Sequence, residues 1–205
     1  MSTTAIEKNN LEESDSVSEK WVRPRMIDMP KGRLAMWWLI ASEIVIFGGL
    51  IATYILFRLR HPEWGHAAGH TSTPLGALNT FFLLTSSLTI VLAHDAANRK
   101  DLKGAVRNMG ITLFFGLGFL VVKSIEYSTE ISHGFTLTAE LFWSFYFLMT
   151  GLHALHVIAG MTTIFIIMLG VRKGKHLHRV EFAGMYWHLV DLVWILLFPL
   201  LYIAH

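Results

Sequence analysis

Five long stretches of mostly apolar residues constrain this chain more than any other feature of its sequence. They cover residues 34–57, 75–93, 109–128, 141–171 and 182–204. An α-helix needs about 20 such residues to cross a bilayer, and only helices and closed barrels satisfy the backbone polar groups there. Barrel strands alternate apolar and polar residues, whereas these stretches are continuously apolar. The sequence therefore predicts an all-α membrane protein with five transmembrane helices.

The composition agrees with this class and excludes others. Hydrophobic residues make up 53% of the chain and charged residues only 16%, and the absence of cysteine excludes disulfides and thiolate metal sites. We find no phosphate-binding glycine loop, no nucleophile triad and no patch typical of nucleic-acid binding. Residues 1–30 are polar and have no signal-peptide core, so we expect a flexible cytoplasmic tail before a transmembrane domain at 31–205.

The distribution of Lys and Arg predicts the orientation of the helices. These residues are frequent before the first stretch, between the second and third, and between the fourth and fifth, but Arg58 and Arg60 are the only ones in the opposite loops. Because basic loops stay on the cytoplasmic side, we expect a cytoplasmic N-terminus and a periplasmic C-terminus.

Several ionisable residues fall inside the apolar stretches, where they are costly and usually face protein or water. At about 1.5 Å per residue, Glu43 lies about 15 Å beyond Arg33, and Asp191 a similar distance into the fifth helix. Together with His188, these two are predicted to form one polar layer. A second layer, nearer the outer surface, is predicted to contain Lys123, Glu126, His153 and His156.

Glu43 has no basic residue within one turn of its own helix. Desolvation at that depth favours the neutral acid. Two interpretations stay open: a carboxyl group that exchanges protons, or a protonated acid that bonds to a neighbouring helix. His94 ends the second stretch on the cytoplasmic side, where its imidazole is available for proton exchange.

His153 and His156 share one helical face and could offer imidazoles to a metal or a haem. The alternative, which the spacing favours, is that they form hydrogen bonds between helices. Lys123 and Glu126 stand three residues apart and are predicted to pair on their own helix in a structural role. The tryptophans within the stretches are expected to act as interfacial anchors or to meet another subunit or lipid; they include Trp37, Trp38, Trp143, Trp187 and Trp194.

The chain resembles subunit III of the haem–copper respiratory oxidases, in particular cytochrome c oxidase. The most specific parts of the resemblance are Thr150-Gly-Leu-His-Ala-Leu-His-Val-Ile-Ala-Gly160 and Tyr186-Trp-His-Leu-Val-Asp-Leu-Val-Trp194. Ser42-Glu43 matches the intramembrane glutamate motif of the family, and Leu78-Asn79-Thr80 and Glu126-Tyr127 follow in order. The resemblance covers all five stretches and is to the short bacterial form.

This resemblance implies a function for the whole complex. It implies a non-catalytic subunit of a terminal oxidase that reduces oxygen to water and pumps protons across the bacterial inner membrane. Haem and copper would belong to partner subunits I and II, and this chain would bind no metal. It would mainly contact subunit I, support proton uptake, and meet cytochrome c only indirectly.

The resemblance also implies roles for lipids and for particular residues. The helices are expected to form two groups around a V-shaped cleft filled with phospholipids. Glu43 matches the carbodiimide-reactive carboxyl of the family, Arg33 precedes it at the spacing of the family, and Arg172 is a second candidate for binding lipid phosphate.

Three alternatives to this function stay open. The quinol oxidases and an accessory protein of nitric oxide reductase share the fold and the Trp-His-x-x-Asp-x-x-Trp pattern, although Ser42-Glu43 favours the cytochrome c branch. A free-standing proton-coupled transporter that uses Glu43, His188 and Asp191 is a more distant one, since we see no internal repeat.

Overall fold

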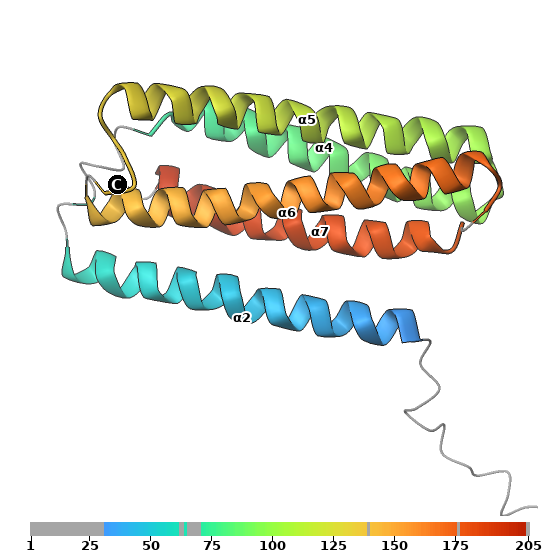
Figure 1. The fold of residues 1–205 in the computed structure, drawn as a ribbon, viewed down its shortest axis with the longest axis horizontal. Coiled ribbons are helices and arrows are strands. Elements are labelled where there is room, and N and C mark those ends of the chain that lie inside the picture. The colour runs from blue at the N-terminus through green and yellow to red at the C-terminus, as the bar shows by residue number, and fades with distance from the viewer. Residues whose placement is uncertain (1–30, 62–63, 65–70, 139, 176, 204–205) are drawn as a thin grey trace, which may run out of the picture. The chain divides into compact units, whose positions relative to one another are not determined.

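The computed structural model describes residues 31–61, 64, 71–138, 140–175 and 177–203, and within them five helices are long and apolar enough to cross a membrane (Figure 1). The predicted all-α membrane fold with five spanning helices is confirmed. The predicted tail at residues 1–30 and residue 204 lie outside the described residues. The helices are α2 (Lys31–Arg60), α4 (Thr73–Asn98), α5 (Leu102–Ser132), α6 (Leu141–Arg172) and α7 (Arg179–Phe198), which continues into the π-helical turn η3 (Pro199–Ile203).

Most of the helices extend beyond the apolar stretches, and α5 shows how polar residues and a glycine set both ends of such a helix. Asp101 accepts a hydrogen bond from the Gly104 backbone N–H at 3.0 Å and so caps the start of α5. Gly134, with φ +87°, follows the end of α5, and the Phe135 N–H donates to the Glu130 carbonyl at 3.0 Å. This left-handed glycine stops the helix in the usual way. For α5, hydropathy alone therefore locates the membrane-spanning centre, and the capping residues set its ends.

Helices α4, α5, α6 and α7 lie side by side and make the closest backbone contacts within the described chain (Figure 1). Trp187 on α7 is fully buried among them. A Cβ atom placed on Gly160 of α6 would lie 2.9 Å from the Trp187 ring, and one on Gly116 of α5 would lie 3.0 Å from it. Small residues at these two points let the large indole fit between the helices.

The burial of the tryptophans corrects one expectation from the sequence. Trp143, Trp187 and Trp194 are fully buried within the chain itself, whereas Trp37 and Trp38 are exposed. The prediction of anchors or of contacts to lipid or another subunit was therefore wrong for the three buried residues. Their indoles fill the core between the helices of this chain because small and medium side chains alone leave gaps between long helices.

From Met36 onward, α2 contacts the other helices through long side chains. The Tyr54 hydroxyl donates to the Leu200 carbonyl at 3.3 Å, and Arg58 donates to the same oxygen at 3.3 Å. The ring of Phe47 lies edge-on to the ring of His156, with 5.4 Å between centroids. These contacts place the polar residues of α2 against α6 and the end of α7.

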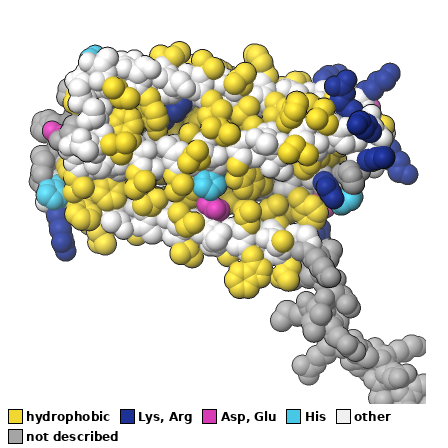
Figure 2. Space-filling view, viewed as in Figure 1, with side chains coloured by type: hydrophobic (Ala, Val, Ile, Leu, Met, Phe, Trp, Pro, Cys, Tyr) yellow, Lys and Arg dark blue, Asp and Glu magenta, His cyan; other side chains and the backbone are white. Residues whose placement is uncertain are grey.

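The outer surface of the helices is mostly hydrophobic (Figure 2). Large side chains such as Phe114, Leu155 and Val45 are more than half exposed, which suits a surface that faces lipid or a partner subunit. Lys and Arg gather at the end where α4 joins α5 and α6 joins α7 (Figures 1 and 2). The cytoplasmic position of that end and the V-shaped lipid cleft stay predictions.

The π-helical turn η3 redirects the end of the chain toward the core. Pro199 has no N–H and its ring crowds the carbonyl four residues earlier, so it widens the helix at that point. Carbonyls in the last turn of a helix lack intrahelical partners, and here they accept side-chain hydrogen bonds, such as the 3.1 Å bond from the Thr73 hydroxyl to the Tyr202 carbonyl. As a result, the Tyr202 side chain is fully buried among the other helices.

Candidate functional site

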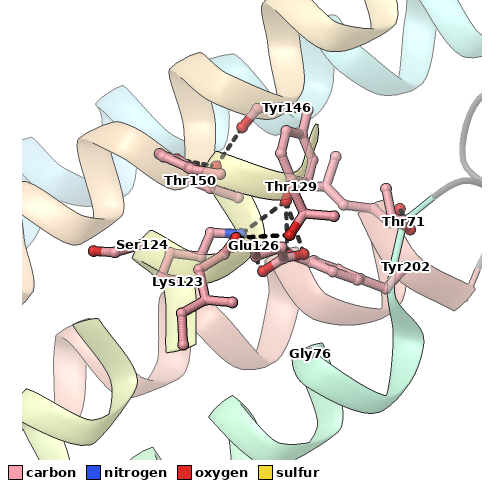
Figure 3. A network of polar contacts seen from close by, with 12 residues as sticks. Thr71, Gly76, Lys123, Ser124, Glu126, Thr129, Tyr146, Thr150 and Tyr202 are labelled. Atoms are coloured by element: carbon pink, nitrogen blue, oxygen red, sulfur yellow. Dashed lines mark hydrogen bonds and ion pairs between the residues drawn. The ribbon is translucent and has the colours of Figure 1, made fainter. Parts of the chain in front are cut away.

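The largest polar cluster surrounds Lys123 and Glu126, which pair on α5 as predicted, with 3.1 Å between Nζ and Oε2. Both side chains are almost completely buried, at 3% and 1% exposure. Lys123 also donates to the hydroxyls of Tyr146 on α6, at 3.0 Å, and Tyr202 on η3. Figure 3 shows these four side chains pointing toward one another. The cluster joins three elements and uses all three N–H donors of the lysine.

The aromatic rings around Lys123 also stabilise its positive charge. The ammonium lies 4.7 Å from the centroid of the Tyr146 ring and 5.2 Å from that of Tyr202, within the range of cation–π attraction. Tyr146 in turn donates to Oε1 of Glu126 at 2.8 Å. A charge pair so enclosed tightens the contact between helices and offers no free group for catalysis.

A second pair joins α2 to α6. Nε2 of His156 lies 3.0 Å from Oε2 of Glu43, and the two side chains are 20% and 13% exposed. The other ring nitrogen, Nδ1, donates to the Leu152 carbonyl at 2.8 Å. Figure 2 shows an acidic side chain against a histidine amid the hydrophobic surface. The partner that the sequence left open for Glu43 is therefore a histidine of the fourth membrane helix.

This pair differs from the predicted layers, which separated Glu43 from His156. Counting residues gives the position along one helix but does not give the offset between two helices. The polar residues predicted to accompany Glu43, namely His188 and Asp191, lie with α4 instead. There the Ser87 hydroxyl and His188 Nδ1 are 2.7 Å apart.

Asp191 is 4% exposed, and neither carboxyl oxygen has a hydrogen-bond partner among the described residues. The Ser87 hydroxyl lies near this carboxyl but bonds to His188. A buried carboxyl without a donor is costly, so this group needs either a proton or a donor from outside the described chain. Asp191 was predicted to share one polar layer with His188, and among the described residues the two side chains form no hydrogen bond with each other.

His153 is completely buried on α6, one turn before His156. Its ring lies edge-on to Phe119 at 5.5 Å and beside Trp194 at 5.3 Å. Neither ring nitrogen has a hydrogen-bond partner within the part of the chain that the structure describes. His156 therefore contacts another helix through the 3.0 Å ion-pair distance to Glu43, whereas the ring of His153 makes no hydrogen bond among the described residues.

The remaining predicted residues lie near the helix ends. His94 is half-buried near the end of α4, 3.1 Å from the amide nitrogen of Asn98. Arg33 is exposed in the first turns of α2. Arg172 ends α6 and lines a cavity of about 370 Å³ together with Lys103 and Arg107 of α5. Three cations beside one cavity form a site suited to a phosphate group.

Metal binding was an open alternative for the histidines. Over the described ranges, no group of three or more His, Asp or Glu side chains is arranged to hold a metal ion. His156 lies 3.0 Å from Glu43, while His153 packs against Trp194.

Three of the partners in these clusters were not predicted: Tyr146, Tyr202 and Ser87. Each of them bonds to a residue on another element, and Tyr202 lies 79 positions from Lys123. Spacing within one helix carries no signal for such a contact. Tyrosines within the fourth and fifth apolar stretches were the available hint, because a buried phenol hydroxyl usually needs a partner.

Comparison with known proteins adds an independent finding. The family model described as cytochrome c oxidase subunit III matches residues 27–205. A protein of Corynebacterium diphtheriae named cytochrome c oxidase subunit 3 is 33% identical over 187 residues, which cover 88% of this chain and 89% of that protein. One of Thermostichus vulcanus with the same name is 34% identical and covers 80% and 83%. A protein of Aeropyrum pernix named heme-copper oxidase subunit I+III is 32% identical over 94% of this chain and 24% of its own length.

Proposed function

This chain belongs to the cytochrome c oxidase subunit III family, and we propose that it supports the redox subunits of its complex and carries no redox centre itself. It is subunit III of a haem–copper oxidase, a multi-pass membrane protein within a complex that contains partner subunits. The proposal concerns what the chain does in that complex, where it lies and what it binds.

The observation that carries the proposal is the way the membrane-depth charges are used. Lys123 donates hydrogen bonds to Glu126, Tyr146 and Tyr202. His156 contacts Glu43 through one ring nitrogen and donates to the Leu152 carbonyl through the other. Groups that are already paired inside the subunit are poor ligands for a haem or for copper. The role best supported is therefore structural support of the subunit that binds these cofactors. Support of proton uptake on the cytoplasmic side is proposed from the family resemblance alone.

The proposed main partner is subunit I, with subunit II as a further partner. Support comes from the Aeropyrum pernix relative, whose name joins subunits I and III in one chain. Two subunits that can be fused must lie close together in the membrane. The exposed hydrophobic faces of this chain provide the surface that such a contact needs.

We also propose that the chain binds phospholipids. The cavity at Lys103, Arg107 and Arg172 suits a phosphate, and an apolar cavity of about 460 Å³ lies along the same two helices, lined by residues such as Phe114 and Phe165. Charge at one end and apolar surface along the helices match the two parts of a lipid.

The proposed location is the bacterial inner membrane, with the N-terminus in the cytoplasm, and the proposed electron donor of the complex is cytochrome c. The alternatives are a quinol oxidase and an accessory protein of nitric oxide reductase. A free-standing transporter is less supported, because Glu43 pairs with His156 and His188 with Ser87, so the expected trio is divided.

The test is to purify the native complex through this chain and measure its haem content and its oxygen consumption with cytochrome c or quinol. We expect a haem-bearing complex oxidised by cytochrome c, and a separately purified chain without visible absorption. A stoichiometric haem spectrum from the isolated chain would refute the supporting role. Turnover with quinol alone would assign the complex to the quinol branch.

A further inference from the structure

His188 lies on the outer surface of α7 at membrane depth. It stands about 14 Å beyond Arg179 along the helix, close to the middle of a hydrocarbon core of about 30 Å. Its side chain is exposed, and its Nδ1 lies 2.7 Å from the Ser87 hydroxyl of α4. The other ring nitrogen, Nε2, has no hydrogen-bond partner among the described residues. A polar group left unbonded at this depth is costly, so Nε2 needs a partner.

Exposed hydroxyl groups elsewhere in the membrane-spanning helices find their partners on their own helix. Each donates to a carbonyl three or four residues earlier; examples are Ser42, Thr53, Ser124, Thr162 and Thr163. The partly exposed Glu43 and His156 lie 3.0 Å apart, so each has an ionisable neighbour within the chain. Nε2 of His188 has neither kind of partner, so its hydrogen bond has to come from outside the described chain.

Apolar side chains surround His188 and Ser87 at helical spacing. Leu192 and Ile195 follow His188 on α7, while Leu84 and Val91 flank Ser87 on α4, and each of these four is about half exposed. We call this surface the His188 face; it consists of Leu84, Ser87, Val91, His188, Leu192 and Ile195. An apolar surface with a polar group near its centre is suited to packing against another helix, because polar side chains form hydrogen bonds between helices in membranes.

We propose that the His188 face docks a transmembrane helix of subunit I, and that this helix places a hydrogen-bonding side chain against Nε2 of His188. Acyl chains offer neither a donor nor an acceptor at this depth, whereas a protein helix offers both. The inference rests on the main partner proposed above, which the name of the Aeropyrum pernix relative supports, and it identifies the face that meets this partner. A second copy of this chain is the other occupant that the experiment distinguishes.

The face is tested by photo-cross-linking of the complex in its native membrane. The photoreactive residue p-benzoylphenylalanine replaces Leu192 on the His188 face or, in a separate variant, Val121 of α5. The two positions are matched, since their side chains are 54% and 51% exposed and each lies about 20 Å beyond an arginine at the basic end of its helix. We expect the Leu192 variant to become linked to the haem-bearing subunit, identified by its peptides, and the Val121 variant to give no link to that subunit.

The possible outcomes separate this inference from the proposed function. Linkage of the haem-bearing subunit from Val121 and not from Leu192 would overturn the assigned face and leave the supporting role intact. Linkage of Leu192 only to lipid, or only to a second copy of this chain, would overturn it as well. A native complex without haem would instead refute the proposed function, and this inference with it.

The role of the imidazole is measured by how much of the haem-bearing subunit stays with this chain during washing with detergent. His188→Leu should lower this retention about threefold or more, whereas His188→Gln keeps a hydrogen-bonding group and should lower it less. Ser87→Ala is the matched control, because it removes the bond within this chain and leaves Nε2 in place. Equal losses in His188→Leu and Ser87→Ala would overturn the hydrogen bond to a partner. The cross-links decide the face even where His188→Leu fails to assemble.

Discussion

The phenol of Tyr146 on α6 donates a 2.8 Å hydrogen bond to Oε1 of Glu126 on α5, while the other carboxyl oxygen, Oε2, lies 3.1 Å from Lys123. One carboxylate thus connects two helices and neutralises a lysine that is 3% exposed. Charges at this depth persist only when every partner is in place.

We predict that Lys123→Met strongly destabilises the subunit, because it leaves the Glu126 carboxylate without its cation. Breaking a buried ion pair from one side costs about 3–5 kcal/mol. Thermal denaturation of the purified complex, followed by the release of this subunit, measures the effect. The double variant Lys123→Met with Glu126→Gln should recover much of the loss. A single variant as stable as the native complex would contradict the prediction.

Close packing against Trp187 gives the second prediction. Gly160→Ala would place a Cβ atom 2.9 Å from the ring and should cost about 1–3 kcal/mol, the usual penalty of overpacking. Gly48→Ala is the matched control, since nothing lies within 4 Å of the added atom in this chain. Thermal release of the subunit should occur earlier in the first variant only. Release of the subunit at the same temperature in both variants would contradict the prediction that the Trp187 ring leaves no room for the added Cβ atom.

The fold was predictable because hydropathy reports directly on the cost of placing a side chain in lipid. The stretch at 141–171 became α6, Leu141–Arg172, with almost the same ends. The stretch at 109–128 became the longer α5, Leu102–Ser132, since Asp101 begins that helix outside the apolar region. Hydropathy is insensitive to such caps.

The candidate site was predictable only within single helices. The Lys123–Glu126 pair follows from a spacing of three residues, but the Tyr202 contact depends on the widened turn at Pro199. The Glu43–His156 pair depends on the offset between two helices, which no residue count provides. Residue type therefore indicated which polar groups needed partners, whereas the packing of the helices determined which residues became those partners.

Replacing Asp191 is predicted to have opposite effects on the isolated chain and on the assembled complex. Its buried carboxyl has no hydrogen-bond donor among the described residues, so Asp191→Leu should raise the thermal stability of the isolated chain. If a partner subunit supplies the donor in the complex, the same change, and the milder Asp191→Asn, should lower the yield of intact complex. A variant that assembles with normal yield would count against a role of Asp191 in assembly.

The basic cavity at the ends of α5 and α6 predicts lipid selectivity. Replacing both Arg107 and Arg172 by Ala should reduce the amount of anionic phospholipid that copurifies with the complex, because two of the three lining cations are lost. Lys173→Ala, an exposed cation outside that lining, is the control and should change little. Mass spectrometry of the extracted lipids measures the effect. Equal anionic lipid in all samples would show that the cavity does not select charge.

The last prediction concerns the reactivity of Glu43. Carbodiimides attack a carboxyl group in its protonated form within an apolar region, and the Glu43 side chain is only 13% exposed within a membrane-spanning helix. Glu43→Gln should therefore abolish labelling of the subunit by an apolar carbodiimide, while Glu140→Gln, at an exposed position before α6, should leave it unchanged. Mass spectrometry of the labelled peptides gives the site. Continued labelling of the Glu43→Gln subunit at the native rate would identify another carboxyl as the reactive one, with Asp191 the first to examine because it too is buried in the membrane.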